Sequence, residues 1–231
     1  MKTLGLLGGM SWESTALYYR AINERVAERL GGHHSAELLL ASVDFEPIVE
    51  MQQAGDWDGA ARLLGAHARR LADAGAELLV LCTNTMHRVA AEIEAAAGIP
   101  LLHIADPTGE ALVVGGHRRV GLLGTRFTME QAFYRDRLVD AFGLEVLTPE
   151  ADDRDHVHRD ISDELVHGVV RDDSRAAYRG VVDRLVASGA ESIILGCTEI
   201  TMLISAGDSS VPVFDTTALH ARAAVDRALA G

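Results

Sequence analysis

The chain contains the same block of sequence twice, and this duplication constrains its fold more than any other feature. Residues 74–85 read AGAELLVLCTNT, residues 188–199 read SGAESIILGCTE, and the two blocks align without a gap. Two further blocks recur in the same order: residues 3–9 resemble residues 119–125, and residues 99–112 resemble residues 211–224. Because this period is far longer than that of solenoid or propeller repeats, we expect two similar domains.

Short apolar runs alternate with helical patterns along the whole chain. Such runs are typical of buried parallel strands. The alternation predicts an α/β protein in which each domain is a parallel sheet flanked by helices. Strands are expected at Thr3–Leu7, Ala36–Val43, Leu78–Cys82, Leu101–Ile104, Val120–Leu123, Leu144–Leu147, Ser192–Leu195 and Val211–Phe214, and helices at 13–30, 56–74, 86–97, 106–115, 129–142, 158–167, 173–188 and 217–230.

The duplication also predicts how the chain divides. We expect one domain to comprise residues 1–105 together with 215–231, whose helix returns to it, and the other to comprise residues 106–214. We expect the two domains to be related by a pseudo-two-fold axis. Because ligands of open α/β sheets bind at the carboxyl ends of the strands, we expect the active site in the cleft between the domains.

Composition argues against several classes of partner and cofactor. The formal net charge of −13 is unsuited to a nucleic-acid partner, which needs a basic surface. The apolar runs are too short to span a bilayer, and the first apolar run is too short and too glycine-rich for a signal peptide. Both features indicate a cytoplasmic protein. Two cysteines without a C-x-x-C spacing support neither a zinc site nor a disulfide framework. Lys2 is the only lysine, so we expect no pyridoxal phosphate, which needs a Schiff-base lysine.

The two copies of the repeat differ at one strand end. Thr83 corresponds to Cys197 in the ungapped alignment, so the fold is expected to place a hydroxyl and a thiol at equivalent positions. Backbone N–H groups and a helix dipole at a strand end would lower the pKa of the Cys197 thiol. Cys197 is therefore a candidate catalytic residue, and the alternative is an ordinary buried cysteine.

Residues around these positions have candidate roles of their own. Cys82 is expected to pack within the sheet, because neighbouring residues of a strand point to opposite faces. His87 either orients a substrate or is an ordinary helix-face histidine.

Ser11 and Thr128 are expected to cap helices. The charged segment 151–160, with its two histidines, is expected to be a solvated loop rather than a metal site. Polar side chains that can bind a small ligand or cap a helix are Asn84, Thr85, Thr198 and Glu199.

Three motifs resemble those of the aspartate/glutamate racemase family: LGLLGGMS at 4–11, CTNTMH at 82–87 and GCTEI at 196–200. The resemblance covers essentially the whole chain. It implies a racemase that works without pyridoxal phosphate, uses one catalytic residue per domain, and forms a homodimer. The family usually carries its first catalytic cysteine at the position of Thr83. A threonine at this position, together with Cys197, resembles the broad-specificity branch of the family. In that branch the substrate is expected to be held at Met10, Gln52, Thr83, Asn84, Thr85, Thr198 and Glu199.

Racemisation suits two groups on opposite faces of a substrate, because one removes the Cα proton and the other returns a proton. We therefore expect a cofactor-independent amino-acid racemase with Cys197 and Thr83 as its catalytic residues, acting on aspartate, glutamate or a broader set that includes homoserine. Arg126 is a candidate for binding a distal carboxylate. One alternative is a maleate isomerase- or decarboxylase-like enzyme that uses Cys197 as a nucleophile. Another is an amino-acid-binding protein with weakened catalysis.

Overall fold

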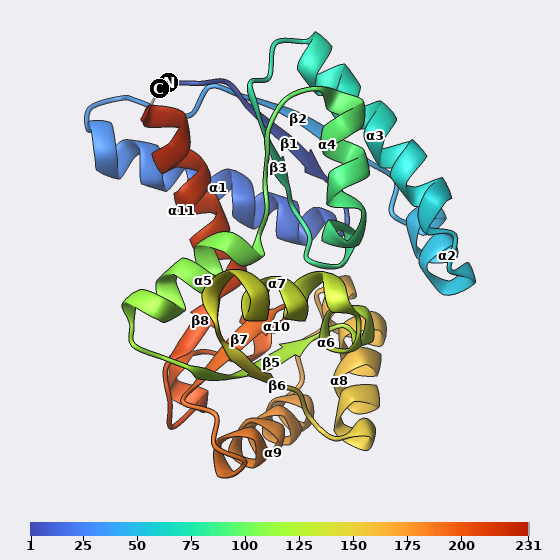
Figure 1. The fold of residues 1–231 in the computed structure, drawn as a ribbon, viewed down its shortest axis with the longest axis vertical. Coiled ribbons are helices and arrows are strands. Elements are labelled where there is room, and N and C mark those ends of the chain that lie inside the picture. Colours follow the sequence, from blue (N-terminus) through green and yellow to red (C-terminus); the bar gives the residue numbers. More distant parts are fainter. Residues whose placement is uncertain (231) are drawn as a thin grey trace. The chain divides into compact units, whose positions relative to one another are not determined.

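The structure, a computed structural model, describes residues 1–230. The chain forms two compact units (Figure 1): unit 1 contains Met1–His103 and the chain from His220, and unit 2 contains Ile104–Leu219. The elements of unit 1 are β1 (Leu4–Gly8), α1 (Trp12–Leu30), β2 (Leu38–Ser42), α2 (Glu46–Ala54), α3 (Trp57–Asp73), β3 (Leu78–Leu81), the 3-10 helix η1 (Thr85–Val89), α4 (Ala90–Ala97) and β4 (Leu101–Leu102).

Unit 2 repeats the same plan. Its elements are α5 (Ala105–Val114), β5 (Arg119–Gly124), α6 (Arg126–Glu130), α7 (Ala132–Phe142), β6 (Glu145–Leu147), α8 (Ala151–Asp163), η2 (Leu165–His167), α9 (Asp172–Ala187), β7 (Ser192–Gly196), α10 (Ile200–Leu203), η3 (Ala206–Asp208), β8 (Val213–Asp215) and α11 (Thr216–Leu229). Helix α11 starts in unit 2 and continues into unit 1.

The two sheets have the same topology. Their strand orders are β2-β1-β3-β4 and β6-β5-β7-β8, and every pair is parallel. Parallel strands need crossover connections, and the helices that make them cover both faces of each sheet. The prediction of two similar α/β units, each a parallel sheet flanked by helices, is confirmed.

Strand alternation divides the core of unit 1 into two layers. Leu78, Val80 and Cys82 of the β3 segment pack with α1 and α11 on one face, whereas Leu79 and Leu81 pack with α3 and α4 on the other. Figure 1 shows α3 and α4 on the opposite side of this sheet from α1 and α11. The predicted packing of Cys82 is confirmed, because its side chain is fully buried in the α1 and α11 layer.

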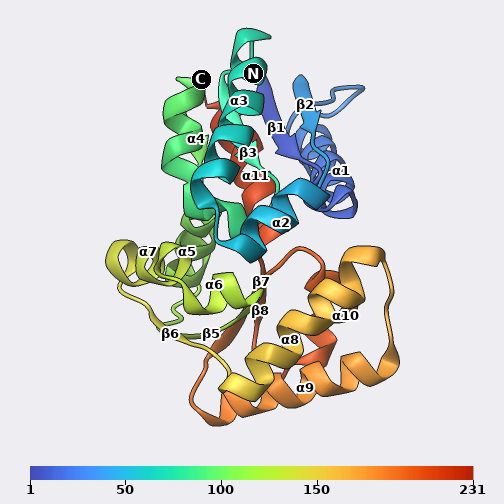
Figure 2. The ribbon, with the colours of Figure 1, turned by 90° about the vertical axis from the view of Figure 1, so that its right-hand side faces the viewer.

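Unit 2 is layered in the same way. Ile193, Leu195 and Cys197 pack with α8 and α9, whereas Ile194 packs with α5 and α7; Figure 2 shows α8 and α9 side by side. Thr83 lies two residues after Leu81, the last residue of β3, and Cys197 lies two residues after Leu195 and directly after β7. Each residue therefore follows the end of the corresponding strand of its own unit.

Two local predictions are wrong. The segment 151–160 is the first part of helix α8 rather than a solvated loop. Val157 and Ile161 lie one turn apart and are buried together with Asp160, and the other charged residues of the segment are at least partly exposed. Thr128 does not cap a helix: the hydroxyl of Thr125 accepts from the Thr128 backbone N–H and caps α6, and Thr128 is itself buried. The predicted cap at Ser11 is confirmed, since its hydroxyl accepts from the backbone N–H of Ser14.

Among residues 1–230, no helix is both long enough and apolar enough to cross a lipid bilayer.

Candidate active site

The loop after β1, residues 9–11, is held in place by its glycine and by Thr15. Gly9 has a φ of 95°, and a Cβ at this position would lie 2.3 Å from the carbonyl oxygen of Val43. No other residue fits such a close approach at a positive φ. The Thr15 hydroxyl accepts from the Gly9 N–H at 2.8 Å and donates to the Ser11 carbonyl at 2.9 Å. This places Met10, a predicted substrate-binding residue, in a buried and ordered loop.

The loop after β3, residues 83–85, carries three of the predicted site residues. Thr83, Asn84 and Thr85 are all buried. Within residues 1–230 the Thr83 hydroxyl has no hydrogen-bond partner, whereas its carbonyl oxygen accepts from Nδ1 of His87 at 2.8 Å. Gln52, on α2, donates from its side-chain amide to the Met86 sulfur at 3.0 Å, which ties α2 to the start of η1.

A group of buried aromatic side chains lies next to the loop after β3, which its member His87 contacts. The ring of His87 lies 4.6 Å from that of His103 and 5.7 Å from that of His220, measured between centroids. Nε2 of His220 contacts the Leu102 carbonyl at 2.9 Å, and Nδ1 contacts the Tyr18 hydroxyl at 2.8 Å. Since a carbonyl can only accept, the Nε2 of His220 carries the proton and Nδ1 accepts from Tyr18.

Burial, followed by the nearby His87, lowers the pKa of His220 to about 3. This ring is therefore neutral at physiological pH. Sequence reasoning singled out His87 but missed Tyr18, His103 and His220. These three residues are far apart in the sequence and share no spacing, so only the parallel crossovers bring them together.

The loop after β7, residues 197–199, forms a compact hydrogen-bonded group. The Cys197 thiol donates to Oε2 of Glu199 at 2.9 Å, and the Thr198 hydroxyl donates to the same oxygen at 2.7 Å. All three side chains are buried. An oxygen that accepts from two donors is well suited to a charged carboxylate. The arrangement pairs a thiol with a group able to accept its proton.

The expected lowering of the Cys197 pKa is wrong. Burial raises the pKa of this thiol well above its ordinary value, and the charge of Glu199 and the hydrogen bond donated to it act in the same direction. The backbone N–H groups of Glu199 and Ile200 lower the pKa, but they are the smaller effects. Cys197 is thus a neutral thiol in the resting protein, and Glu199 is the nearby acceptor for its proton.

The predicted site residues therefore fall into two groups, each within its own unit. Unit 1 holds Met10, Gln52, Thr83, Asn84 and Thr85, and unit 2 holds Cys197, Thr198 and Glu199. Arg126, at the start of α6, has Nη1 3.9 Å from Oδ1 of Asp155 in an exposed pair. A pair this long and exposed contributes little to stability, so it does not fix the guanidinium in one place.

Residues 1–230 contain no group of three or more His, Cys, Asp and Glu side chains arranged to hold a metal ion.

A family model described as Asp/Glu/hydantoin racemase matches residues 7–224. The chain belongs to this family. The resemblance seen in the three sequence motifs is thereby confirmed.

Solved structures of high similarity cover nearly the whole chain. A protein of Yersinia pestis, described as a candidate Asp/Glu racemase, is 58% identical with a TM-score of 0.92, and the match covers 99% of this chain and 100% of that chain. An aspartate racemase homologue of Pyrococcus horikoshii OT3 is 33% identical with a TM-score of 0.84, over 99% of this chain and 100% of that chain.

A curated relative adds a functional description. The broad specificity amino-acid racemase RacX of Bacillus subtilis (strain 168) is 25% identical over 167 residues, which covers 71% of this chain and 70% of that protein. The expected enzyme class, a racemase, agrees with the family and with these relatives.

Proposed function

We propose that this enzyme interconverts L- and D-amino acids without an organic cofactor, by exchanging the Cα proton. The observation that carries the proposal is the hydrogen bond between the Cys197 thiol and the Glu199 carboxylate at the end of β7. It supplies a proton donor and a proton acceptor in one buried place. The equivalent end of β3 supplies Thr83, whose hydroxyl has no internal partner among residues 1–230.

The proton transfers can be written in full for one direction. Glu199 takes the proton of the Cys197 thiol, and the thiolate then removes the Cα proton from one face of the substrate. The carbanion takes a proton on the other face through the Thr83 hydroxyl, which gives its own proton and receives one from solvent. Cys197 keeps the Cα proton as its thiol, and Glu199 releases to solvent the proton that it took, so the protons balance and the site is restored. The reverse direction uses the same groups in the opposite order. Because the two faces carry unequal groups, we expect unequal solvent-isotope incorporation in the two directions.

The substrate proposed is a small amino acid, with aspartate, glutamate and homoserine as the first to test. We propose that its polar groups bind to the strand-end loops. The binding residues proposed are Met10, Gln52, Asn84, Thr85, Thr198 and Glu199, with Arg126 as the candidate for a second carboxylate. RacX is described as broad in specificity, which supports testing many amino acids rather than one.

Independence from pyridoxal phosphate also belongs to the proposal. A Schiff base needs a lysine, and Lys2 is the only one in the sequence. It precedes β1, at the opposite end of that strand from the loop of residues 9–11. The homodimer and the cytoplasmic location stay predictions.

A panel of L- and D-amino acids in deuterated water tests the proposal. Proton NMR follows the loss of the Cα signal, and chiral chromatography follows the appearance of the other enantiomer. We expect exchange and inversion together for at least one substrate. Inversion for none of them would overturn the racemase assignment.

The thiol and carboxylate pair also supports a second candidate function, in which the thiolate of Cys197 attacks a substrate carbon as a nucleophile. This is the chemistry of the isomerase- or decarboxylase-like alternative. It predicts a covalent adduct on Cys197 visible by mass spectrometry of the intact protein. An amino-acid-binding protein would instead bind ligand without exchange or adduct.

A further inference from the structure

Both backbone groups of Thr83 are hydrogen-bonded within unit 1. Its N–H donates to the Leu81 carbonyl at 2.9 Å, which closes a three-residue turn around Cys82. Its carbonyl accepts from Nδ1 of His87, four residues further along, at 2.8 Å. The Thr83 hydroxyl has no such partner among residues 1–230. The place of this hydroxyl therefore depends on the two bonds that hold the backbone of Thr83.

The corresponding carbonyl of unit 2 is held in a different way. The carbonyl of Cys197 accepts from the backbone N–H of Ile200 at 3.2 Å, and every residue except proline supplies such a group. When the ungapped alignment is extended by two residues, His87 corresponds to Thr201, whose hydroxyl donates to the Thr198 carbonyl at 2.7 Å. In unit 1, by contrast, the bond depends on the histidine side chain.

The ring of His87 is held by buried neighbours. Since a carbonyl only accepts, the proton in the bond to Thr83 is on Nδ1 of His87. His87 is 3% exposed, and its ring packs edge-on against His103 and His220, at interplanar angles of 65° and 68°. The ring therefore keeps its Nδ1–H directed at the loop after β3.

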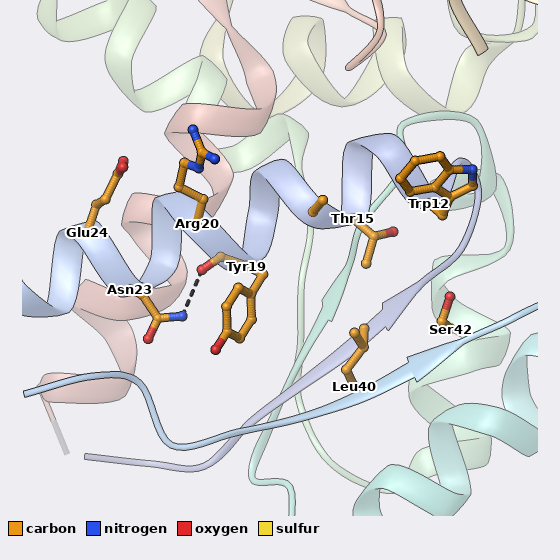
Figure 3. Close-up of a pocket in the computed structure, with 9 residues that line it drawn as sticks. Trp12, Thr15, Tyr19, Arg20, Asn23, Glu24, Leu40 and Ser42 are labelled. Carbon is orange, nitrogen blue, oxygen red and sulfur yellow. Dashed lines mark hydrogen bonds between the residues drawn. The ribbon is translucent and has the colours of Figure 1, made fainter. Parts of the chain in front are cut away.

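Tyr18 links this group of rings to helix α1. Neighbouring tyrosines of α1 have different surroundings: Tyr19 is 54% exposed and points toward the side of α1 on which β2 lies (Figure 3), whereas Tyr18 is fully buried. The Tyr18 hydroxyl contacts Nδ1 of His220, on α11, at 2.8 Å. His220 cannot turn without the loss of this buried hydrogen bond, so it is a fixed support for the ring of His87.

We propose that His87 is a positioning residue for the Thr83 hydroxyl. Its bond to the Thr83 carbonyl fixes the residue that transfers a proton on the second face of the substrate. The effect on catalysis rests on the proposed function, whereas the bond itself does not. Loss of the bond frees the backbone of Thr83, and a displacement of about 1 Å at a reacting group can slow a step roughly 100-fold. The proton transfer at Cys197 should keep its rate.

The two faces of the substrate distinguish this role from a general loss of structure. When Cys197 removes the Cα proton in deuterated water, its thiol exchanges that proton with solvent through Glu199 and can return a deuteron to the same face. A C–H bond is then replaced by a C–D bond without inversion, and the proton goes to solvent. If only the step at Thr83 is slowed, this deuteration continues while inversion slows. For the opposite enantiomer, whose Cα proton faces Thr83, both should slow together.

Three substitutions of His87 test the proposal. His87→Leu removes the donor, His87→Asn keeps an N–H donor at the same number of bonds from the backbone, and His87→Gln moves that donor one carbon further out. NMR measures deuteration and chiral chromatography measures inversion, for both enantiomers. For the enantiomer that faces Cys197, the ratio of deuteration to inversion should rise about tenfold or more in His87→Leu and His87→Gln. It should stay near the wild-type ratio in His87→Asn.

His33→Leu, at an exposed position outside the site, is the matched control and should keep the wild-type ratio. If His87→Leu does not fold, the comparison of His87→Asn with His87→Gln decides. A wild-type ratio in His87→Gln, or a ratio raised equally in His87→Asn, would overturn the proposal. Equal losses of deuteration and inversion for both enantiomers would also overturn it, because a merely structural role predicts that result.

The bond can also be tested without activity. In protein with isotope-labelled histidine, proton–nitrogen NMR should show a slowly exchanging proton on Nδ1 of His87, and this signal should disappear in His87→Asn. A wild-type protein without that signal would overturn the positioning role, whatever its activity. A wild-type protein that shows the signal but neither exchanges nor inverts any amino acid would overturn the proposed function instead.

Discussion

The thiol of Cys197 donates a hydrogen bond of 2.9 Å to the carboxylate of Glu199, two residues further along the same loop. Under the proposed function, this contact lets a thiol with a raised pKa act as a base. The proton does not need to leave for bulk solvent, because its acceptor is already in contact. In that proposal the pair is a two-residue acid/base unit rather than a free thiolate.

Replacement of the thiol should stop catalysis without stopping binding. In Cys197→Ser the hydroxyl can still donate to Glu199, but it is a much weaker acid than a thiol. We expect the rate of Cα exchange to fall about 10²- to 10⁴-fold, the usual contribution of a positioned acid/base. Calorimetric titration with the preferred amino acid should give an affinity close to that of wild type. Unchanged exchange in Cys197→Ser would refute the assignment.

Removal of the Glu199 charge should have two opposite effects. Glu199→Gln takes away a charge that raises the pKa of Cys197, so the pKa of the thiol should fall. It also takes away the proton acceptor, so exchange should slow, by roughly 10²-fold or more. Thiolate absorbance near 240 nm against pH measures the first effect, and NMR exchange measures the second. Wild-type exchange in Glu199→Gln, together with a lowered thiol pKa, would refute the assignment of Glu199 as the proton acceptor.

The titration must also account for Cys82, the other thiol in the sequence. Burial raises its pKa far above the ordinary range for a thiol, so it should contribute no thiolate signal. A Cys82→Ala variant with the same titration curve is the control.

The fold follows from sequence because it depends on repeated, local patterns. The duplicated apolar runs predict both sheets, and the ungapped alignment of Thr83 with Cys197 predicts equivalent strand ends. The predicted helix at 158–167 covers only the second part of α8. Its first part differs from the prediction because Val157 and Ile161 are the only buried apolar residues of α8, too few to show helical periodicity beside so many charges. The direction of the Cys197 pKa shift was also missed. It depends on burial and on where the Glu199 carboxylate points, and the C-T-E motif specifies neither.

The histidine group next to Thr83 is a second feature that local sequence patterns do not predict. His87, His103 and His220 come from three separate segments, and their contact arises from tertiary packing alone. A pattern that is local in sequence cannot predict a contact of this kind.

A thiol at position 83 should make the two faces of the site more alike. Thr83→Cys replaces a hydroxyl, which is a poor acid and base, with a second thiol. The enantiomers have equal free energies, so kcat/KM must already be the same in both directions, and the change must appear elsewhere. We expect kcat for the two directions, and the primary isotope effects on them, to become more similar.

Cys82→Ala is the control for that experiment, because Cys82 packs on the opposite face of β3. It should leave both kcat values essentially unchanged. Loss of activity in Cys82→Ala together with normal activity in Thr83→Ala would mean that the wrong residue of this pair has been assigned to the site.

His220 should make unit 1 less stable in acid. Its folded-state pKa of about 3 lies below the value near 6.5 of an unfolded histidine. The unfolded chain therefore binds a proton that the folded chain does not, and stability is lost as pH falls from about 6.5 toward 3. At pH 5 this loss is about 2 kcal/mol relative to neutral pH.

His220→Phe should be less stable at pH 8, because Tyr18 and Leu102 lose their partner, but its stability should depend less on pH. Both tryptophans, Trp12 and Trp57, lie in unit 1, so urea unfolding followed by tryptophan fluorescence reports on this unit. His34→Asn, at an exposed position, is the matched control and should retain the wild-type slope between pH 4.5 and 6.5. Equal slopes for wild type and His220→Phe in that window would show that His220 does not remain neutral in the fold.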